Sequence, residues 1–166
     1  MDLSLLFPKA QGRPTKLKEA LNGADVSGLP LFNDKYAKLW PQIPVPQGAR
    51  LKSAAHLVIG QGFNSCIKPN PNMPCCTLPK TQTGRGFATI ARWDEQRALS
   101  IGEAKRIGSF PDLYQLTGDY STQWMRIGNS VPPLLMRAIA LQIKSVMFGG
   151  QPLTSYPSTM SYLDIL

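Results

Sequence analysis

The chain has 166 residues, of which 43% are hydrophobic and 17% charged, and a formal net charge of +8. This length suffices for one domain of ordinary size, and the composition excludes a fibre, a low-complexity tail and a disulfide-stapled miniprotein. No run approaches the roughly 20 apolar residues of a membrane helix, and the N-terminus carries an acid where a secretory signal carries positive charge. We therefore expect a soluble, cytoplasmic protein with no membrane partner.

The positive charge is concentrated in the first half of the chain. From Lys35 to Trp93 the sequence holds eight lysines and arginines and no acidic residue. A surface of this sign attracts polyanions, and nucleic acid is the first candidate. The alternative is that the charge serves only solubility.

The first half of the chain is rich in turn-forming residues. Residues 15–21 (TKLKEAL) predict a short helix with Thr15 as its N-cap and a stop at Asn22 and Gly23. Between residues 41 and 93, apolar bursts at 55–59 and 86–90 are separated by Gly, Pro and Asn. This pattern predicts short strands and loops.

Two helices are predicted in the second half. Ser100 is followed three residues later by Glu103, a capping box that predicts a short helix ending before Pro111. After two prolines that suit a first helical turn, Leu135 begins an apolar repeat at every fourth residue, which predicts a longer helix over 132–147. Gly149 is expected to end this helix, and residues 149–166 are expected to form a tail.

The last predicted helix is too apolar for a single narrow stripe. Leu134, Ala138 and Leu141 lie beside the row that starts at Leu135 and widen it. A helix of this kind is normally buried on more than one side. We expect the helix over 132–147 to be covered by another lobe, by the tail, or by a second copy of the chain through self-association.

Two segments carry a family resemblance. The sequences RALSIGEAKRIGSFPD at 97–112 and RIGNSVPP at 126–133 resemble, in order and spacing, the last two motifs of the DNA (cytosine-5) methyltransferases. The stretch from PCCTL at 74–78 to Trp93 is similar to the end of the target-recognition region of that family. The chain is thus identified as resembling the C-terminal part of such an enzyme.

The resemblance implies an α+β fold and three regions. These are a loop-rich target-recognition domain with short strands at 1–98, the last two motifs with the capped helix and the long C-terminal helix at 99–148, and a tail at 149–166. The family's glycine-rich loop for the methyl donor, its Glu-Asn-Val motif and its Arg-rich motif do not occur in the sequence, and the one Pro-Cys step, at 74–75, does not stand at the position of the family nucleophile. We therefore expect the Rossmann-like catalytic lobe to be absent from this chain, which would then hold no catalytic residue.

The resemblance also implies binding roles for particular residues. Double-stranded DNA is expected to meet two recognition loops, one at 61–65 and the other at 78–86, which is called the recognition loop below. Arg85 is the candidate base reader, Lys80 is expected on phosphate and Thr77 near the extruded cytidine. S-adenosylmethionine is expected to contact the loop ahead of the last helix, as one wall of the donor pocket. The expected DNA-binding residues are Asn64, Lys68, Thr77, Lys80, Thr81, Gln82 and Arg85, and the expected donor-binding residues are Asn129, Ser130 and Val131. The loop at 129–131 is called the donor loop below. The alternative for this loop is a plain helix N-terminus capped by Asn129 or Ser130.

The cysteines are expected to be inert. Cys75 follows a proline as the family nucleophile does, but it lies next to the recognition loop and has no Glu-Asn-Val partner. A zinc site formed by His56, Cys66, Cys75 and Cys76 lacks the two-residue spacing that presents paired thiolates to the ion. We expect neither catalysis nor a metal here.

Two functions remain. The first is the recognition part of a DNA (cytosine-5) methyltransferase, inactive alone and completed by a catalytic lobe or subunit. The second is a stand-alone DNA-binding module with no role in methylation. The loop at 129–131 favours the first, because a module that only binds DNA has no use for a donor-pocket wall.

Overall fold

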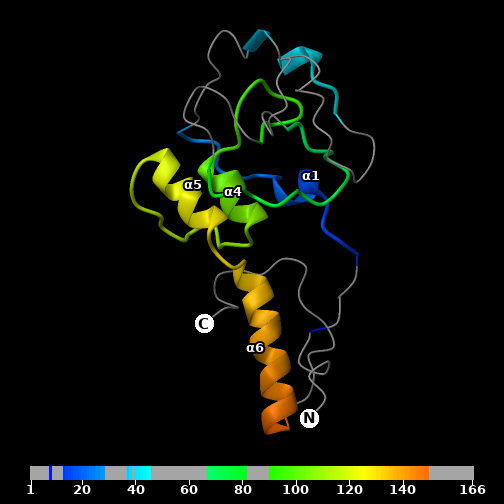
Figure 1. The fold of residues 1–166 in the computed structure, drawn as a ribbon, viewed down its shortest axis with the longest axis vertical. Coiled ribbons are helices and arrows are strands. Elements are labelled where there is room, and N and C mark those ends of the chain that lie inside the picture. Colours follow the sequence, from blue (N-terminus) through cyan, green and yellow to red (C-terminus); the bar gives the residue numbers. More distant parts are fainter. Residues whose placement is uncertain are drawn as a thin grey trace.

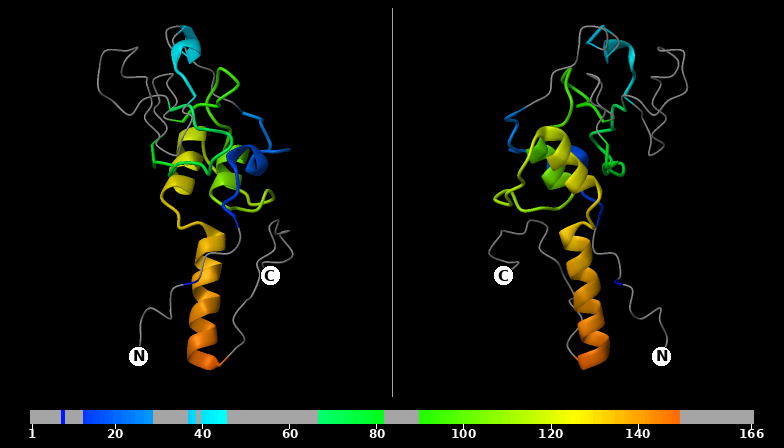
Figure 2. Two further views of the ribbon diagram at one scale, coloured as in Figure 1. Left: turned by 90° about the vertical axis from the view of Figure 1, so that its right-hand side faces the viewer. Right: turned by 60° about the vertical axis from the view of Figure 1, so that its left-hand side comes forward.

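The structure, a computed structural model, describes residues 8, 13–28, 37–38, 40–45, 67–81 and 90–149. These hold the helices α1 (Leu17–Ala20), α4 (Ile101–Ile107), α5 (Tyr120–Gly128) and α6 (Pro133–Phe148), and the 3-10 turn η2 (Trp40–Gln42). Helices α1, α4 and α5 lie together in one body, and α6 projects from it as a rod (Figures 1 and 2).

The core joins segments that are far apart in the sequence. Helix α4 packs against both α5 and α1. The buried cluster consists of Leu17, Leu21, Ile90, Leu99, Ala104, Trp124 and Ile127. It therefore draws on both sides of residue 98, and the expected division of the chain into 1–98, 99–148 and 149–166 remains a prediction.

Helix α4 begins as its capping box predicts. The Ser100 hydroxyl accepts the Glu103 N–H at 2.9 Å, and the Glu103 carboxylate accepts the Ser100 N–H at 2.8 Å. These bonds satisfy two amide groups that the first turn of a helix leaves without intrahelical partners. The predicted start at Ser100 is confirmed.

Helix α1 starts later than the sequence predicts. Its N-cap is Lys16 rather than Thr15, and the Lys16 N–H donates to the Glu19 carboxylate at 3.4 Å. The prediction of Thr15 as N-cap is therefore wrong by one residue. The helix begins where Glu19, inside the first turn, accepts the Lys16 N–H. The helix is short, and its position is fixed by Leu17, whose N–H donates to Met73 O at 2.9 Å and whose side chain is buried.

Helix α5 was not predicted from the sequence. Asp119 caps it by accepting the Thr122 N–H at 2.9 Å, and Trp124 and Ile127 form its buried face. The Asp cap and the apolar spacing at 120, 124 and 127 are the signal that could have found it.

The predicted strands are not tested. In the described ranges the chain forms isolated bridges, parallel between Ile67 and Ile90 and antiparallel between Ala91 and Ala98, and no longer strand. The apolar burst at 55–59 and most of that at 86–90 lie outside the described residues. The α+β fold class therefore stays a prediction.

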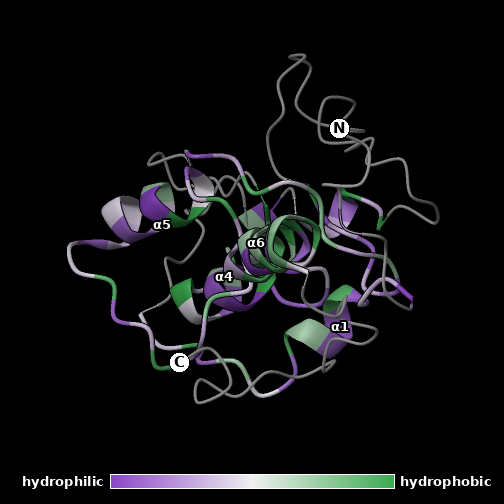
Figure 3. Cartoon of the chain, turned by 90° about the horizontal axis from the view of Figure 1, so that it is seen from below, coloured by the Kyte–Doolittle hydropathy of each residue, from purple (hydrophilic) through white to green (hydrophobic). Residues whose placement is uncertain are grey.

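Helix α6 is the long helix that the sequence predicts. It runs to Phe148 and ends at Gly149, whose φ of 70° is the left-handed conformation that glycine adopts without strain. None of its residues is buried. In the view along α6 in Figure 3, most of its ribbon has apolar colours. The tail at 150–166, one of the expected covers, lies outside the described residues.

One stretch, Tyr120–Phe148, is long and apolar enough in composition to cross a membrane. The structure divides it into α5, which ends at Gly128, and α6, which begins at Pro133. At 1.5 Å per residue α6 spans about 24 Å, which is shorter than the ~30 Å of a hydrocarbon core. The division favours a helix that packs against protein.

Candidate functional site

The end of α5 is in direct contact with the predicted recognition loop. The Trp124 indole N–H donates to Pro79 O at 2.9 Å, and Trp124 itself is buried. A Cβ at Gly128 would lie 2.5 Å from Pro79 O and 2.7 Å from Lys80 Cα, both of which are backbone atoms. The loop therefore crosses α5 at a distance that only glycine allows.

Two sets of predicted residues flank this crossing. Lys80 and Thr81 follow Pro79 and are exposed, as is Thr77. Asn129 follows Gly128 and is exposed, and so is Val131, while Ser130 is half-buried. The structure thus places Lys80, from the predicted DNA-binding set, against Gly128, which directly precedes the predicted donor-binding residues 129–131.

The donor loop is not a cap for α6. Asn129 instead ends α5, with its N–H donating to Met125 O at 3.0 Å, and the Ser130 hydroxyl donates to Ile127 O at 2.6 Å. The N-cap position of α6 is Pro132, which has no capping side chain. The alternative in which Asn129 or Ser130 caps the last helix is therefore wrong. The side chains of Asn129 and Val131 remain available to a ligand.

The cap of α6 comes from the preceding motif. Ser109 has a φ of 60°, a conformation uncommon for a side-chain-bearing residue, and its hydroxyl accepts the Leu134 N–H at 3.1 Å. The first motif thus holds the start of the helix that follows the second. Sequence reasoning missed Ser109 because the two residues are 25 positions apart.

Lys68 lies inside the molecule. It is 5% exposed, and its Nζ is 3.6 Å from the centroid of the Trp40 ring, a cation–π contact. The Trp40 indole N–H donates in turn to Arg92 O at 3.3 Å. A phosphate contact by Lys68 would require the ammonium to leave this position, and its DNA-binding role stays a prediction.

Three expected DNA contacts cannot be placed. Asn64, Gln82 and Arg85 lie outside the described residues. The same holds for His56 and Cys66 of the rejected zinc set. Among the residues that the structure does describe, no group of three His, Cys, Asp or Glu side chains could hold a metal ion.

The environment of Cys75 disfavours nucleophilic chemistry. Cys75 and Cys76 are free, half-buried and packed against the core cluster. The neighbouring Cys76 thiol, and then burial, raise the pKa of Cys75 well above its ordinary value. A thiol in this state is protonated at neutral pH, and the thiolate is the reactive form.

A buried ionic cluster holds the first motif to the segment before it. The Glu103 carboxylate accepts two hydrogen bonds from Arg97, at 2.8 and 3.0 Å, and a third from Arg92. Burial alone would raise the pKa of Glu103, but the hydrogen bonds from Arg97 and the Ser100 N–H outweigh it and lower the pKa. Arg97 and Glu103 are therefore architectural residues.

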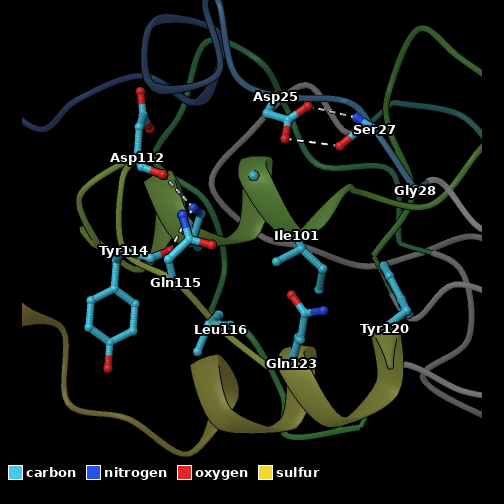
Figure 4. A pocket seen from close by; sticks show the side chains of 12 residues that line it. Asp25, Ser27, Gly28, Ile101, Asp112, Tyr114, Gln115, Leu116, Tyr120 and Gln123 are labelled. Atoms are coloured by element: carbon cyan, nitrogen blue, oxygen red, sulfur yellow. Dashed lines mark hydrogen bonds between the residues drawn. The ribbon is translucent and has the colours of Figure 1, made fainter. Parts of the chain in front are cut away.

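An open cavity of about 390 Å³ lies on the side of α4 and α5 (Figure 4). Ile101, Leu116 and Tyr120 line it together with the polar side chains of Gln123 and Asp25, and two hydrogen bonds from Ser27 hold the Asp25 carboxylate. None of the predicted site residues that the structure describes lines this cavity. It is separate from the crossing of the recognition loop and α5.

Comparison with known proteins matches most of the described chain to one family. The sequence model described as C-5 cytosine-specific DNA methylase matches residues 16–145. The chain belongs to this family. Both segments that carry the resemblance, at 97–112 and 126–133, fall inside the match, as does the crossing of the recognition loop and α5.

Several methyltransferases are similar to parts of the chain. Type II methyltransferase M.AplI of Arthrospira platensis is 34% identical over 113 residues, which are 62% of this chain and 33% of that protein. Type II methyltransferase M.AgeI of Thalassovita gelatinovora is 52% identical over 48 residues, 29% of this chain and 11% of that protein. DNA (cytosine-5)-methyltransferase 1 of Rattus norvegicus is 35% identical over 83 residues, 50% of this chain and 4% of that protein. The chain thus spans a third or less of the length of these relatives.

Proposed function

We propose that this chain is the target-recognition and C-terminal part of a DNA (cytosine-5) methyltransferase. The complete enzyme transfers a methyl group from S-adenosylmethionine to C5 of cytosine in double-stranded DNA, and this part reads the DNA and forms one wall of the donor pocket. The bacterial relatives are named type II methyltransferases, which supports a cytoplasmic enzyme of a restriction-modification system.

The observation that carries this proposal is the crossing of the recognition loop and α5. The exposed Lys80 and Thr81 follow the contact between Pro79 and Gly128 on one chain segment, and Asn129 follows it on the other. A DNA contact and a donor contact must lie near each other in a methyltransferase, because the methyl group passes from donor to base. A stand-alone DNA-binding module, the second candidate, has no such requirement.

The donor loop fits one side of an S-adenosylmethionine pocket. Asn129 offers an exposed amide for hydrogen bonding, and Val131 offers an apolar side chain that is 52% exposed. The Ser130 hydroxyl is engaged by Ile127 O, so its contribution would be structural or through its backbone. A single loop cannot enclose a ligand, because sites for small molecules bury most of the surface of the ligand.

Helix α6 supports the need for a catalytic lobe or subunit. Its Leu135, Met136 and Met147 are exposed, and the buried Nη1 of Arg137 has no hydrogen-bond partner in the described ranges. A buried donor without a partner costs about 1–3 kcal/mol. A lobe that covers α6 with an apolar surface would remove the cost of exposing Leu135, Met136 and Met147 to water.

The test is the salt dependence of binding to duplex DNA. We expect the variant Lys80→Ala/Arg85→Ala to bind more weakly than the wild type and to have a flatter dependence of log Kd on log salt, because each lost phosphate contact lowers that slope by about one unit. The control is Lys18→Ala/Lys144→Ala, which removes the same charge from exposed positions on α1 and α6. An unchanged affinity and slope in the first variant would remove the loop from the DNA interface.

A further inference from the structure

Gly128 is unusual because its backbone does not need glycine. It is the last residue of α5, and glycine in a helix is about 1 kcal/mol less favourable than alanine. The requirement comes from outside the helix, where Pro79 O and Lys80 Cα occupy the space that a Cβ would fill. These are backbone atoms, so they cannot give way as a side chain would.

Trp124 holds the same carbonyl from one turn earlier on α5. Its indole N–H donates to Pro79 O at 2.9 Å, and its ring is 1% exposed and stacks with Tyr120 at a centroid distance of 6.0 Å. The ring is thus fixed by the core, and the carbonyl is fixed by the ring. Close approach at Gly128 and the hydrogen bond from Trp124 together set the height of the recognition loop over α5.

We infer that Trp124 and Gly128 are positioning residues that fix Lys80 and Thr81 relative to the donor loop. Lys80 directly follows Pro79, whose carbonyl accepts the hydrogen bond from Trp124. Asn129 directly follows Gly128, whose missing side chain allows that carbonyl to come close. A shift of the loop at this point moves the DNA contacts without altering any of them chemically. This inference rests on the proposed function, because it assumes that Lys80 contacts DNA.

The test is a double-mutant cycle on the affinity for duplex DNA at low salt. In the wild-type background, Lys80→Ala should weaken binding by about fivefold, as expected for one lost phosphate contact. In the Gly128→Ala background the same change should weaken binding by less than about twofold, because a displaced Lys80 has already lost its contact.

Gly102→Ala is the matched control. A Cβ at Gly102 in α4 would lie 2.3 Å from Asp25 O, so this variant also forces a helix away from a crossing backbone, and the nearest atoms belong to Asp25 and not to the recognition loop. A general loss of packing would act in both glycine variants. The positioning role predicts that Lys80→Ala keeps its full effect in the Gly102→Ala background.

Trp124→Phe gives a second route, which keeps an aromatic side chain in the core and removes the indole N–H together with part of the ring. Its control, Trp40→Phe, removes an indole N–H that donates to Arg92 O, another backbone carbonyl. We expect the effect of Lys80→Ala to shrink with Trp124→Phe and to persist with Trp40→Phe. Thermal unfolding shows whether each variant is folded. If Gly128→Ala does not fold, the result with Trp124→Phe tests the positioning role.

The outcomes separate the inference from the proposed function. A full effect of Lys80→Ala in the folded Gly128→Ala and Trp124→Phe proteins would overturn the positioning role and leave the DNA contact intact. An absent effect of Lys80→Ala in the wild-type background would overturn the contact, and the positioning role with it.

Discussion

At the scale of residues, Glu103 is the group on which the first motif depends. Its carboxylate is fully buried and is bound by Arg97, Arg92 and the Ser100 N–H. A buried charge is tolerated only when it is paired and hydrogen-bonded. Glu103 therefore joins the start of α4 to the segment that leads into it.

Removing this charge should cost a large part of the stability. We expect Glu103→Gln to lower the free energy of unfolding by about 3–5 kcal/mol, because it removes the buried carboxylate that binds both Arg97 and Arg92 and leaves the buried Arg97 only an exposed ionic partner. The matched control is Glu95→Gln, which changes an exposed carboxylate bound to the same Arg97 and should cost about 1 kcal/mol or less. Urea unfolding measures both. Equal losses in the two variants would contradict the assignment.

The same carboxylate makes stability depend on pH. The folded state lowers the pKa of Glu103, so the stabilisation it gives is present above the unfolded pKa of about 4.3 and is lost as the pH falls through the folded value. We expect the urea midpoint of the wild type to fall on acidification below about pH 4 more steeply than that of Glu103→Gln. Parallel curves for the two proteins would show that other groups govern the acid limit.

At the scale of elements, α6 is an apolar helix with no buried residue. Leu135, Ile139, Ile143 and Val146 lie along one side of it, which is too much apolar surface for a helix that stays in water. Apolar area contributes about 25 cal/mol per Å² when it is covered, so a few hundred Å² is comparable with the stability of a small domain. In Figure 1, α6 projects away from the body formed by α1, α4 and α5, so these helices do not cover its apolar side.

We therefore expect the chain alone to self-associate through α6. Sedimentation velocity over a range of concentrations should show a species larger than the monomer for the wild type and a monomer for Ile139→Asp, because a carboxylate in the apolar stripe opposes its burial. Lys144→Asp is the control, since it adds the same side chain at an exposed position off that stripe. A wild type that stays monomeric would show that the stripe is covered within one chain or tolerates water.

At the scale of the whole molecule, the sites on this chain are one-sided. The donor loop is exposed, and the raised pKa of Cys75 disfavours a thiolate at the only Pro-Cys step in the sequence. A one-sided loop does not bury enough of a ligand to bind it tightly. Under the proposed function, we therefore expect methyl transfer to require a catalytic lobe in addition to the residues described here.

The corresponding prediction concerns activity. The purified chain should incorporate no methyl label from S-adenosylmethionine into duplex DNA and should show no tight donor binding by calorimetry. Addition of a matching catalytic lobe should restore incorporation, and Asn129→Ala should then raise KM for the donor more than KM for DNA. Methyl incorporation by the chain alone would contradict the proposal that catalysis requires a separate lobe.

The features that the sequence predicted correctly depend on neighbours close along the chain. The cap of α4 joins Ser100 to Glu103, and the end of α6 depends on the single residue Gly149. The two late motifs, which led to the family, are likewise continuous stretches of sequence. Short-range hydrogen bonds and backbone preferences are encoded locally, so one sequence is enough to find them.

The contacts between these elements are visible only in the folded chain. Trp124 donates to a carbonyl 45 residues away, the Ser100 hydroxyl to one 75 residues away, and Lys68 is buried against Trp40. The buried face of α5 and the contact at Gly128 follow from the same packing. Such contacts form because the chain must cover its apolar surface and satisfy its buried polar groups at the same time, and no local pattern specifies which distant segment will do so.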